Sequence, residues 1–459
     1  MKKLSVAKFG GSLLDTEGEG IQTILERVRE LKERCDLGPV VVFSAPNGFT
    51  NELINIGESY AQSRPISVNP IFNSYERIAK IHVKDAHLKQ LLLELVKYRK
   101  QTDEALASIS KRFDGNVKAK VLTSGGELPT SVLMDYIMKA KGLDSCHIPK
   151  ERWPVVTDDN FENAAPLYEA SKRRISHLIE HLEEGKIVSQ AGFLGATVDG
   201  LETILGRGGS DLTAIFVSCL LKSRYHVETL LFKDVPIQSA DPQMVRGQKT
   251  RHVTSLTYNE AHKASMMGMK IVQGAAIAIA RRFKQTIKVV PINAPEEYTV
   301  IQSESVTGDT VKCVAGKFGC AILSMQDEKS RSLEDALRIW ESRNDFLDLG
   351  TETLDTGKRI RDFLFLDSEF LRKHEERLKG FDENLTIEYG VGVVTLIGDG
   401  MKDSPGVASI AIGAIPEINI KRANFAPHTS QIILVVGEKN VDATVAAIHL
   451  KRDKMNESR

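Results

Sequence analysis

Residues 4–12, LSVAKFGGS, decide the fold class of this chain. The apolar run LSVAKF is typical of a buried β-strand, and the two glycines that follow predict a tight turn. Residues 21–34, IQTILERVRELKER, come next, and their apolar side chains recur at helical spacing. A second buried strand is predicted at PVVVF, residues 39–43. This order of strand, turn, helix and strand indicates an α/β fold with a mostly parallel sheet between helices.

The same alternation continues to about residue 300. One amphipathic helix is predicted at 171–185, and a buried helix, apolar almost all round, at 212–222. Residues 65–120 are more polar and are expected to form an insertion or a helical cap. Further buried strands are predicted at IVSQAG (187–192), ETLLF (228–232) and TIKVVPI (286–292).

The pattern changes after residue 294. A Glu-, Thr- and Ser-rich stretch, 296–309, is expected to be a linker or an edge strand. Two units of similar layout follow, with corresponding strands about 70 residues apart. Each unit is predicted to be a strand–helix–strand–strand module of α+β type, and such modules pair with each other or with a second chain.

Composition excludes several classes of protein. The chain has 459 residues, enough for two to four domains, and its 61 Lys and Arg balance its 61 Asp and Glu. That balance argues against binding to nucleic acid through bulk positive charge. No apolar run approaches the roughly 18 residues of a membrane span, and the N-terminus does not resemble a secretory signal. Five scattered cysteines form no C-x-x-C pair. We therefore expect a cytoplasmic protein without a nucleic-acid or membrane partner.

Candidate chemistry lies in glycine-rich loops that follow predicted strands. Lys8-Phe9-Gly10-Gly11-Ser12 could present amide hydrogens and a lysine charge to a phosphate, or be only a tight surface turn. Gly206–Asp211 precedes the buried helix and could form an anion site. Within it, Arg207 suits a substrate carboxylate unless it is merely solvated, and Asp211 could cap the helix or orient a lysine or a metal.

Two more loops of this kind complete the set. Thr123–Leu128 contains Glu127, which is either a capping carboxylate or the partner of a substrate ammonium. Ser44–Asn51 follows the strand PVVVF, and its Asn and Gly could serve only the turn. Because ligands bind at the carboxyl ends of parallel strands, the four loops together predict a site for phosphate and a small anion. No Walker or G-x-G-x-x-G fingerprint is present.

The motifs KFGGS, SAPNGFTN, SGGEL, GRGGSDLTA, KDVPIQSADP and GMKIV, in this order, resemble those of the aspartokinases in the amino acid kinase superfamily. The C-terminal GDGMKDSPGVASIAIGAIPEINI is similar to an ACT domain. The resemblance implies phosphorylation of the side-chain carboxylate of L-aspartate by MgATP, the entry step to lysine, threonine and methionine. Such a carboxylate is ionised at neutral pH, so alignment and charge neutralisation suffice without a general base.

The resemblance also implies roles for single residues. Lys8 should neutralise charge on the transferring phosphate, and Asp211 should orient Lys8. Arg207 should clamp the α-carboxylate of aspartate, and Glu127 should bind its ammonium group. Further substrate positions are Thr50, Gly208, Gly209 and Ser210. Further nucleotide positions are Phe9, Gly10, Gly11, Ser12, Lys233, Asp234 and Lys270. No protein ligand to a metal is expected.

Four departures from the family pattern occur around the nucleotide positions. The family usually has Thr where this chain has Lys233, and the following loop is one residue shorter. The other departures are Gln238 for Tyr, Gln243 for Arg and Gln273-Gly274 for His-Pro. We expect all four to lie near the base and ribose of the nucleotide, away from Lys8, Arg207, Asp211 and Glu127. The chain should therefore be an active kinase.

The resemblance divides the chain into a catalytic domain (1–300), a first ACT-like unit with its linker strand (301–385) and a second ACT domain (386–459). It implies dimers or higher oligomers and an amino-acid effector, lysine or threonine. Effectors bind near the loop after the first strand, which keeps Pro405-Gly406 in the second unit but reads Asp327–Ser332, without glycine, in the first. Asn419 is either a ligand position or a turn residue.

Two alternatives to aspartate kinase activity remain open. The altered nucleotide loop beside ACT-like units would also suit a non-catalytic amino-acid sensor. A sister kinase for another acidic amino acid or for carbamate would share the glycine loops. Only the polar tail 451–459 follows the second ACT unit, so we expect a monofunctional kinase without the homoserine dehydrogenase domain of bifunctional relatives.

Overall fold

The computed structural model describes residues 1–15, 17–206, 208–269, 271–304, 308–340, 346–426 and 430–457. The chain forms two compact units. The first consists of Met1–Pro236 and Ala275–Ser303, and the second of Ile237–Gly274 and Glu304–Arg459. Two segments of the chain therefore contribute to each unit.

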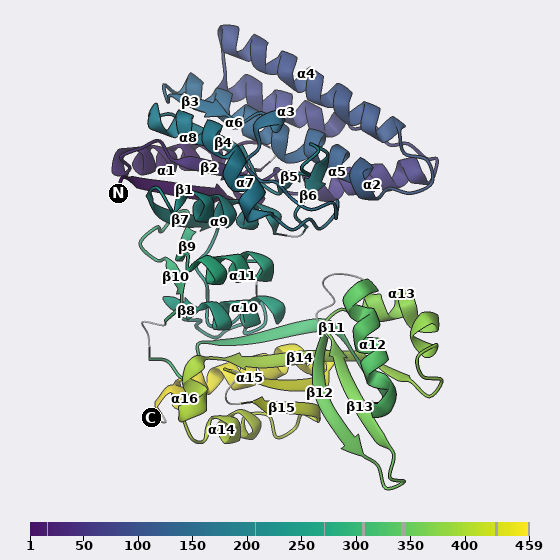
Figure 1. Cartoon of the computed structure of the whole chain (residues 1–459). Helices are drawn as coiled ribbons and strands as arrows, with labels where there is room; N and C mark the ends of the chain where they lie inside the picture. Colours follow the sequence, from purple (N-terminus) through teal and green to yellow (C-terminus); the bar gives the residue numbers. More distant parts are fainter. Residues whose placement is uncertain are drawn as a thin grey trace. The chain divides into compact units, whose positions relative to one another are not determined.

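The first unit is built on a mostly parallel sheet with the strand order β3-β4-β2-β1-β7-β9-β10, which can be followed down Figure 1. β10 runs antiparallel to β9, whereas the pairs from β3 through β9 are parallel. Its strands are β1 (Lys3–Phe9), β2 (Val40–Phe43), β3 (Ser145–His147), β4 (Ile187–Ala191), β7 (His226–Lys233), β9 (Ile287–Pro291) and β10 (Thr299–Gln302). The predicted parallel sheet is confirmed, and the stretch expected to be a linker or edge strand contains β10.

Every side chain of β2 and β4 is buried, although successive residues of a strand point to opposite faces of the sheet. Both faces of the sheet are therefore covered, and helices form these covering layers. The fully buried helix α9 packs against β1, β2 and β7. The helices are α1 (Ile21–Arg34), α2 (Phe49–Ala61), α3 (Asn69–His82), α4 (Asp85–Ala107), α5 (Gly115–Leu122), α6 (Leu128–Ala140), α7 (Tyr168–Arg174), α8 (Ser176–Glu183), α9 (Gly209–Leu221) and α11 (Gly274–Phe283). A small hairpin, β5 (Leu194–Ala196) with β6 (Glu202–Ile204), completes the unit.

Two predictions for this unit need correction or completion. The prediction of a single helix at 171–185 is wrong. This segment is divided into α7 and α8 at Ile175, whose ψ of −8° interrupts the helix. The apolar stripe of α8 is nevertheless buried as predicted, because it packs against β4. The polar stretch 65–120 is largely helical and forms α3, α4 and most of α5.

The second unit confirms the repeated strand–helix–strand–strand module. Its antiparallel sheet has the order β12-β13-β11-β14-β16-β15, so the two first strands pair and the modules share one sheet. The first module is β11 (Cys313–Gln326), α12 (Asp327–Trp340), β12 (Phe346–Thr353) and β13 (Arg359–Phe365), followed by α13 (Ser368–Lys379). The second is β14 (Thr386–Ile397), α14 (Val407–Gly413), β15 (Ile420–Ala426) and β16 (Gln431–Gly437), followed by α15 (Val441–Leu450) and α16 (Arg452–Glu457).

The prediction of an effector-binding loop at residues 327–332 of the first module is wrong. Residues 327–332 form the first turns of α12, which begins directly after β11. The Asp327 carboxylate lies 3.0 Å from the guanidinium of Arg359 on β13. In the second module a loop is present between β14 and α14, and it ends at Gly406 with a φ of +82°, a conformation that favours glycine.

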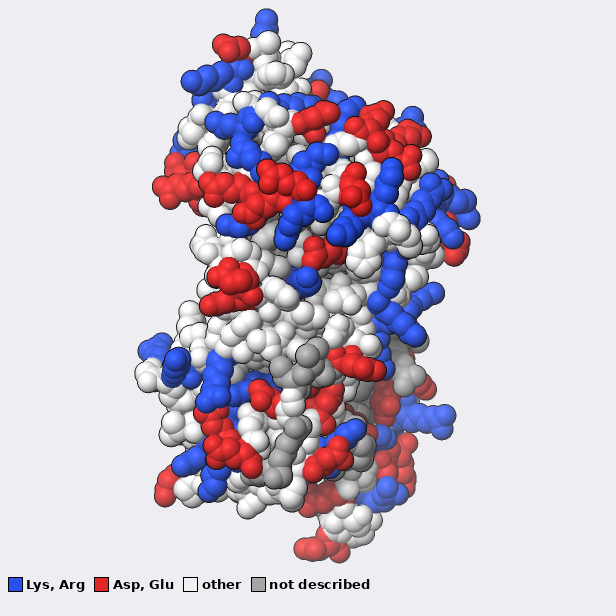
Figure 2. Space-filling view, turned by 90° about the vertical axis from the view of Figure 1, so that its left-hand side faces the viewer, with Lys and Arg blue, Asp and Glu red and all other residues white. Residues whose placement is uncertain are grey.

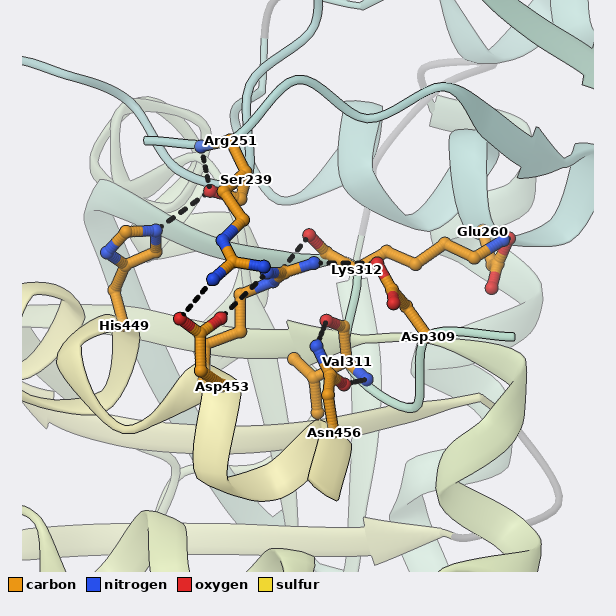
Figure 3. A network of polar contacts seen from close by, with 10 residues as sticks. Ser239, Arg251, Glu260, Asp309, Val311, Lys312, His449, Asp453 and Asn456 are labelled. Atoms are coloured by element: carbon orange, nitrogen blue, oxygen red, sulfur yellow. Dashed lines mark hydrogen bonds and ion pairs between the residues drawn. The ribbon is translucent and has the colours of Figure 1, made fainter. Parts of the chain in front are cut away.

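Segment 237–274, which contains β8 (Ser255–Thr257) and α10 (Tyr258–Met266), is tied to the modules by polar contacts (Figure 3). Ser239 Oγ is hydrogen-bonded to Nε2 of His449 at 2.8 Å. The Arg251 guanidinium lies 2.6 Å from the carboxylate of Asp453. Both partners belong to the C-terminal helices, about 200 residues away in the sequence, and no local pattern could have predicted these pairings.

A fully buried ion pair lies in the same network. Lys312 Nζ is 2.7 Å from Glu260 Oε2, and the two side chains are 2% and 0% exposed. Glu260 also accepts hydrogen bonds from the backbone N–H groups of Thr257 and Asp399, both at 2.8 Å. The charge of Glu260 is therefore neutralised and its oxygens are hydrogen-bonded without water.

The surface carries both signs of charge. Figure 2 shows acidic and basic side chains interspersed on the face it presents, with no single positive patch over it. Within the described part of the chain, no helix has the length and apolar character required to cross a membrane.

Candidate active site

A cavity of about 570 Å³ opens at the carboxyl ends of β1 and β2 in the first unit. Parallel strands place ligand sites at this edge, because the following loops converge there with helix N-termini. The cavity wall combines the loop after β1, the loop after β2, the turn before α6 and the start of α9. Charged side chains in the wall are Lys8, Lys118, Glu127, Glu162 and Asp211.

The turn after β1 requires glycine because of a close approach between two loops. A Cβ atom on Gly11 would lie 2.4 Å from the carbonyl oxygen of Ala45 in the loop after β2. The short 3-10 helix Gly11–Leu13 follows, and both Gly11 and Ser12 line the cavity. The backbone can therefore approach a phosphate here without obstruction from a side chain.

Asp211 holds two lysines at the base of the site. Its Oδ1 lies 2.8 Å from Lys8 Nζ, and its Oδ2 accepts a hydrogen bond from Lys233 Nζ at 3.1 Å. The Lys8 and Asp211 side chains are 9% and 5% exposed. Asp211 lies in the first turn of α9, whose N-cap Gly208 has a φ of +71°. Of the two readings of Asp211 from sequence, the orientation of a lysine agrees with this contact.

The pKa values of this group reflect burial and the shared charge. Burial lowers the pKa of Lys8 from its usual value, Asp211 opposes that shift, and the charge of Lys233 adds to it. Burial alone would raise the pKa of Asp211, but the charges of Lys233 and Lys8 outweigh it and hold this pKa at about 2. Asp211 is therefore ionised at neutral pH, and its single negative charge faces two lysine side chains.

Glu127 is a buried carboxyl in the cavity wall. It ends the π-helical turn Thr123–Glu127, and a hydrogen bond from Tyr75 Oη to the Gly126 carbonyl (2.7 Å) supports this turn. A Cβ on Gly125 would lie 2.6 Å from the Leu53 side chain, so a larger residue here would displace that side chain. Such π-turns are frequent at functional sites.

The Glu127 carboxyl is poised to bind a cation. The residue is 4% exposed, and its Oε2 has no hydrogen-bond partner among the described residues. Burial raises its pKa to about 8, although backbone hydrogen bonds and the charge of Lys8 act in the other direction. A buried carboxyl in a cavity with one oxygen unsatisfied is a site that a ligand ammonium could fill.

The other predicted residues lie in different surroundings. Thr50, Gly208, Gly209 and Ser210 line the cavity. Phe9 belongs to the core, where its ring stacks on Phe43 and Phe232, so only its backbone could face a ligand. Asp234 is exposed, and Gly10 lies beside Lys8, with 3.4 Å between a Cβ added there and Lys8 Nζ. Arg207 and Lys270 lie outside the described residues.

One expectation about the site is wrong. Lys233 was expected to lie away from Asp211, but its ammonium group contacts the Asp211 carboxylate directly; its expected place at the nucleotide stays a prediction. The sequence showed that Lys233 replaces the usual threonine, but the contact depends on the register between β1 and β7, which a sequence pattern does not give.

Sequence reasoning also missed Lys118 and Glu162. Both line the cavity, and Lys118 Nζ lies 2.6 Å from Glu162 Oε2. Glu162 additionally accepts the backbone N–H of Gly115 at 2.8 Å, at the start of α5. Lys118 lies in the polar stretch 65–120, where the sequence offered no motif, and only the folding of α5 against the site brings it there.

The residues present fit the phosphates of a nucleotide, because a glycine turn, a helix N-terminus and net positive charge converge on one cavity. Among the described residues, no three His, Cys, Asp or Glu side chains are grouped as a metal site. Mg²⁺ that accompanies a nucleotide is commonly bound through one or two carboxylates together with the phosphates.

Comparisons with known proteins identify the family and the fold. The model of the amino acid kinase family matches residues 3–291. An aspartokinase of Helicobacter pylori is 25% identical over 413 residues, which are 86% of this chain and 98% of the relative. The structure of E. coli aspartokinase III in complex with aspartate and ADP matches with a TM-score of 0.78 and 20% identity, over 97% of this chain and 99% of that one. The same enzyme in complex with lysine and aspartate has a TM-score of 0.71 and 19% identity, over 98% and 99% of the two chains.

Proposed function

This chain belongs to the amino acid kinase family, and from that premise we propose that it is an aspartate kinase. It transfers the γ-phosphate of ATP to the side-chain carboxylate of L-aspartate and forms 4-phospho-L-aspartate. Relatives named aspartokinase match it over most of its length, and one solved relative holds aspartate and ADP. The reaction would be the entry step to lysine, threonine and methionine.

The observation that carries the proposal is that a lysine-rich group and a buried carboxyl line one cavity. Lys8 and Asp211 lie at the end that receives phosphate, and the buried carboxyl of Glu127 lines the same cavity. An acceptor that carries a carboxylate and an ammonium group suits this cavity, because the carboxylate can face the lysine group and the ammonium group can face Glu127. The acceptor carboxylate is already ionised, so the chain needs no general base.

The remaining work of these residues is alignment and charge neutralisation. Lys8 neutralises negative charge that moves from the γ-phosphate toward the leaving oxygen. Asp211 holds Lys8 in place, while backbone N–H groups of Gly11 and Ser12 face the phosphates. Glu127 and Thr50 position the acceptor, and we assign Arg207 to its α-carboxylate by resemblance alone. When bound, Mg²⁺ supplies further neutralisation of the phosphate charge.

The raised pKa of Glu127 predicts a pH-dependent affinity for aspartate. With a pKa of about 8, the carboxyl is mostly protonated at pH 7 and must lose its proton to hold the substrate ammonium group. The KM for aspartate should therefore fall about tenfold per pH unit as the pH rises toward 8 and then level off. Initial rates between pH 6 and 8.5 at saturating ATP measure this profile.

The variant Glu127→Gln supplies the control for that profile. It preserves the shape of the side chain but cannot ionise, so its KM for aspartate should be high and nearly independent of pH. A wild-type KM that is flat across the same range, or a variant that retains the wild-type profile, would rule out this role of Glu127.

ADP release with different acceptors tests the proposed activity. We expect release with aspartate, and little with glutamate or without an acceptor. Release with glutamate or carbamate in preference to aspartate would instead identify a sister kinase. Amino-acid binding without ATP turnover would identify a sensor protein. Repeating the assay with lysine and threonine tests regulation in the same experiment.

We further propose that an amino-acid effector, lysine or threonine, binds at the second module. That module keeps a loop ending in Pro405-Gly406, whereas the corresponding residues of the first form helix α12. The aspartokinase III structure with bound lysine supports an effector of this kind. Full activity at millimolar lysine and threonine would contradict the assignment.

The domain division at residues 300 and 385, a homodimeric or higher assembly and a cytoplasmic location also remain proposals. The two modules leave β12 and β15 at the edges of their sheet, where a second chain could pair. Light scattering of the full chain tests the assembly, and a monomer would contradict it. Limited proteolysis tests the domain boundaries, and cuts inside the predicted domains would contradict them. Cell fractionation tests the cytoplasmic location, and recovery of the protein in the membrane fraction would contradict it.

A further inference from the structure

Lys233 occupies a position from which it can change the charge of the phosphate site. The parallel strands β1 and β7 pair with Lys8 opposite Leu231 and Phe9 opposite Phe232. Paired residues in parallel strands point to the same face, and so do residues two apart on one strand. Lys8 and Lys233 therefore point to the same face of the sheet, on which Asp211 at the start of α9 receives both.

Each lysine contacts a different oxygen of Asp211, at 2.8 Å for Lys8 and 3.1 Å for Lys233. The Lys233 side chain is 27% exposed, more than the 9% of Lys8. If Lys8 alone faced Asp211, the pair would have no net charge. With both lysines protonated, the three groups carry one net positive charge, one more than the pair.

From this geometry we propose that Lys233 is a positioning residue for phosphoryl transfer: it shares the negative charge of Asp211 with Lys8, so that the charge of Lys8 is only partly compensated and can still neutralise the phosphate. The inference rests on the proposed kinase activity. It explains why a departure from the family pattern need not weaken the site: Lys233 adds a positive charge beside the group that receives the γ-phosphate. A neutral side chain at this position would leave Asp211 to Lys8 alone.

Variants at position 233 separate charge from shape. Lys233→Met removes the ammonium group, while Lys8 still pairs with Asp211, so the fold should persist. We expect kcat to fall about 100-fold, whereas the KM for aspartate should change less than about threefold because Glu127 and Thr50 are untouched. Lys233→Arg keeps the charge and should retain at least about a tenth of the wild-type kcat.

Lys288→Met is the matched control. Lys288 lies on β9 of the same sheet, is 31% exposed and pairs with Glu228 at 2.6 Å. Its variant should keep the wild-type kcat, because it removes a comparable ion pair away from the cavity. A kcat for Lys233→Met within about threefold of wild type would overturn the proposal, as would a loss in Lys233→Arg equal to that in Lys233→Met.

Calorimetry with pyrophosphate tests the charge without catalysis. Wild type and Lys233→Arg should bind pyrophosphate, and Lys233→Met should bind it about tenfold more weakly. Equal affinity in wild type and Lys233→Met would overturn the proposal. If the wild type shows no aspartate-dependent ADP release, the proposed function fails, and the pyrophosphate measurement still decides the role of Lys233.

Discussion

Replacement of Lys8 by methionine is expected to lower kcat for aspartate-dependent ADP formation about a thousandfold. Lys8 is buried at the carboxyl end of β1, and its ammonium group lies between Asp211 and the glycine turn. Methionine keeps most of the volume but leaves the phosphate charge without this neutralising group. The loss should appear in kcat, because the interaction matters most as charge moves in the transition state.

Lys3→Met controls for the removal of a lysine from the same strand. Lys3 is exposed at the opposite end of β1, so its variant should keep wild-type kcat. Steady-state ADP release measures both variants, and circular dichroism verifies that both are folded. A folded Lys8→Met protein with kcat within tenfold of wild type would remove Lys8 from the mechanism.

Replacement of Lys312 by methionine is expected to have the largest effect on stability. The variant would leave the carboxylate of Glu260 buried without its counter-charge, which costs about 3–5 kcal/mol of the free energy of unfolding. The two remaining N–H donors, from Thr257 and Asp399, do not replace an ammonium group. Urea unfolding followed by circular dichroism measures the loss as a lower midpoint.

Two further variants isolate the buried charge as the cause. Adding Glu260→Gln to Lys312→Met removes that charge while keeping a hydrogen-bond acceptor, and should recover at least about half of the lost stability. Lys379→Met breaks an exposed pair with Glu375, so it should cost less than about 0.5 kcal/mol. If the double variant is no more stable than Lys312→Met alone, the unpaired charge is not what destabilises it.

Much of the fold was predictable because it follows local periodicity. The strand, glycine turn and helix over residues 4–34 are present as predicted, with α1 at the expected residues. The two strand–helix–strand–strand modules were also predictable, since each repeats the same order of apolar stretches. The division of 171–185 into two helices was not, because the apolar stripe continues across Ile175 and carries no signal for the break.

The candidate site was predictable where glycine and charge coincide in one loop. Lys8, Gly11, Glu127 and Asp211 were identified in this way, and the structure brings them to one cavity. Contacts set by strand register or by distant segments were not predictable. The pairing of Lys233 with Asp211 is one such contact, and the attachment of Ser239 to His449 across 210 residues is another.

The central claim is that phosphate is transferred to the side-chain carboxylate of aspartate, and trapping of the product with hydroxylamine tests it most directly. An acyl phosphate reacts with hydroxylamine to give a hydroxamate, whereas the substrate carboxylate does not. We predict that incubation with ATP, Mg²⁺ and L-aspartate yields aspartate β-hydroxamate in proportion to the ADP released, and that Lys8→Met yields almost none. ADP release by the wild type without any hydroxamate would contradict the claim.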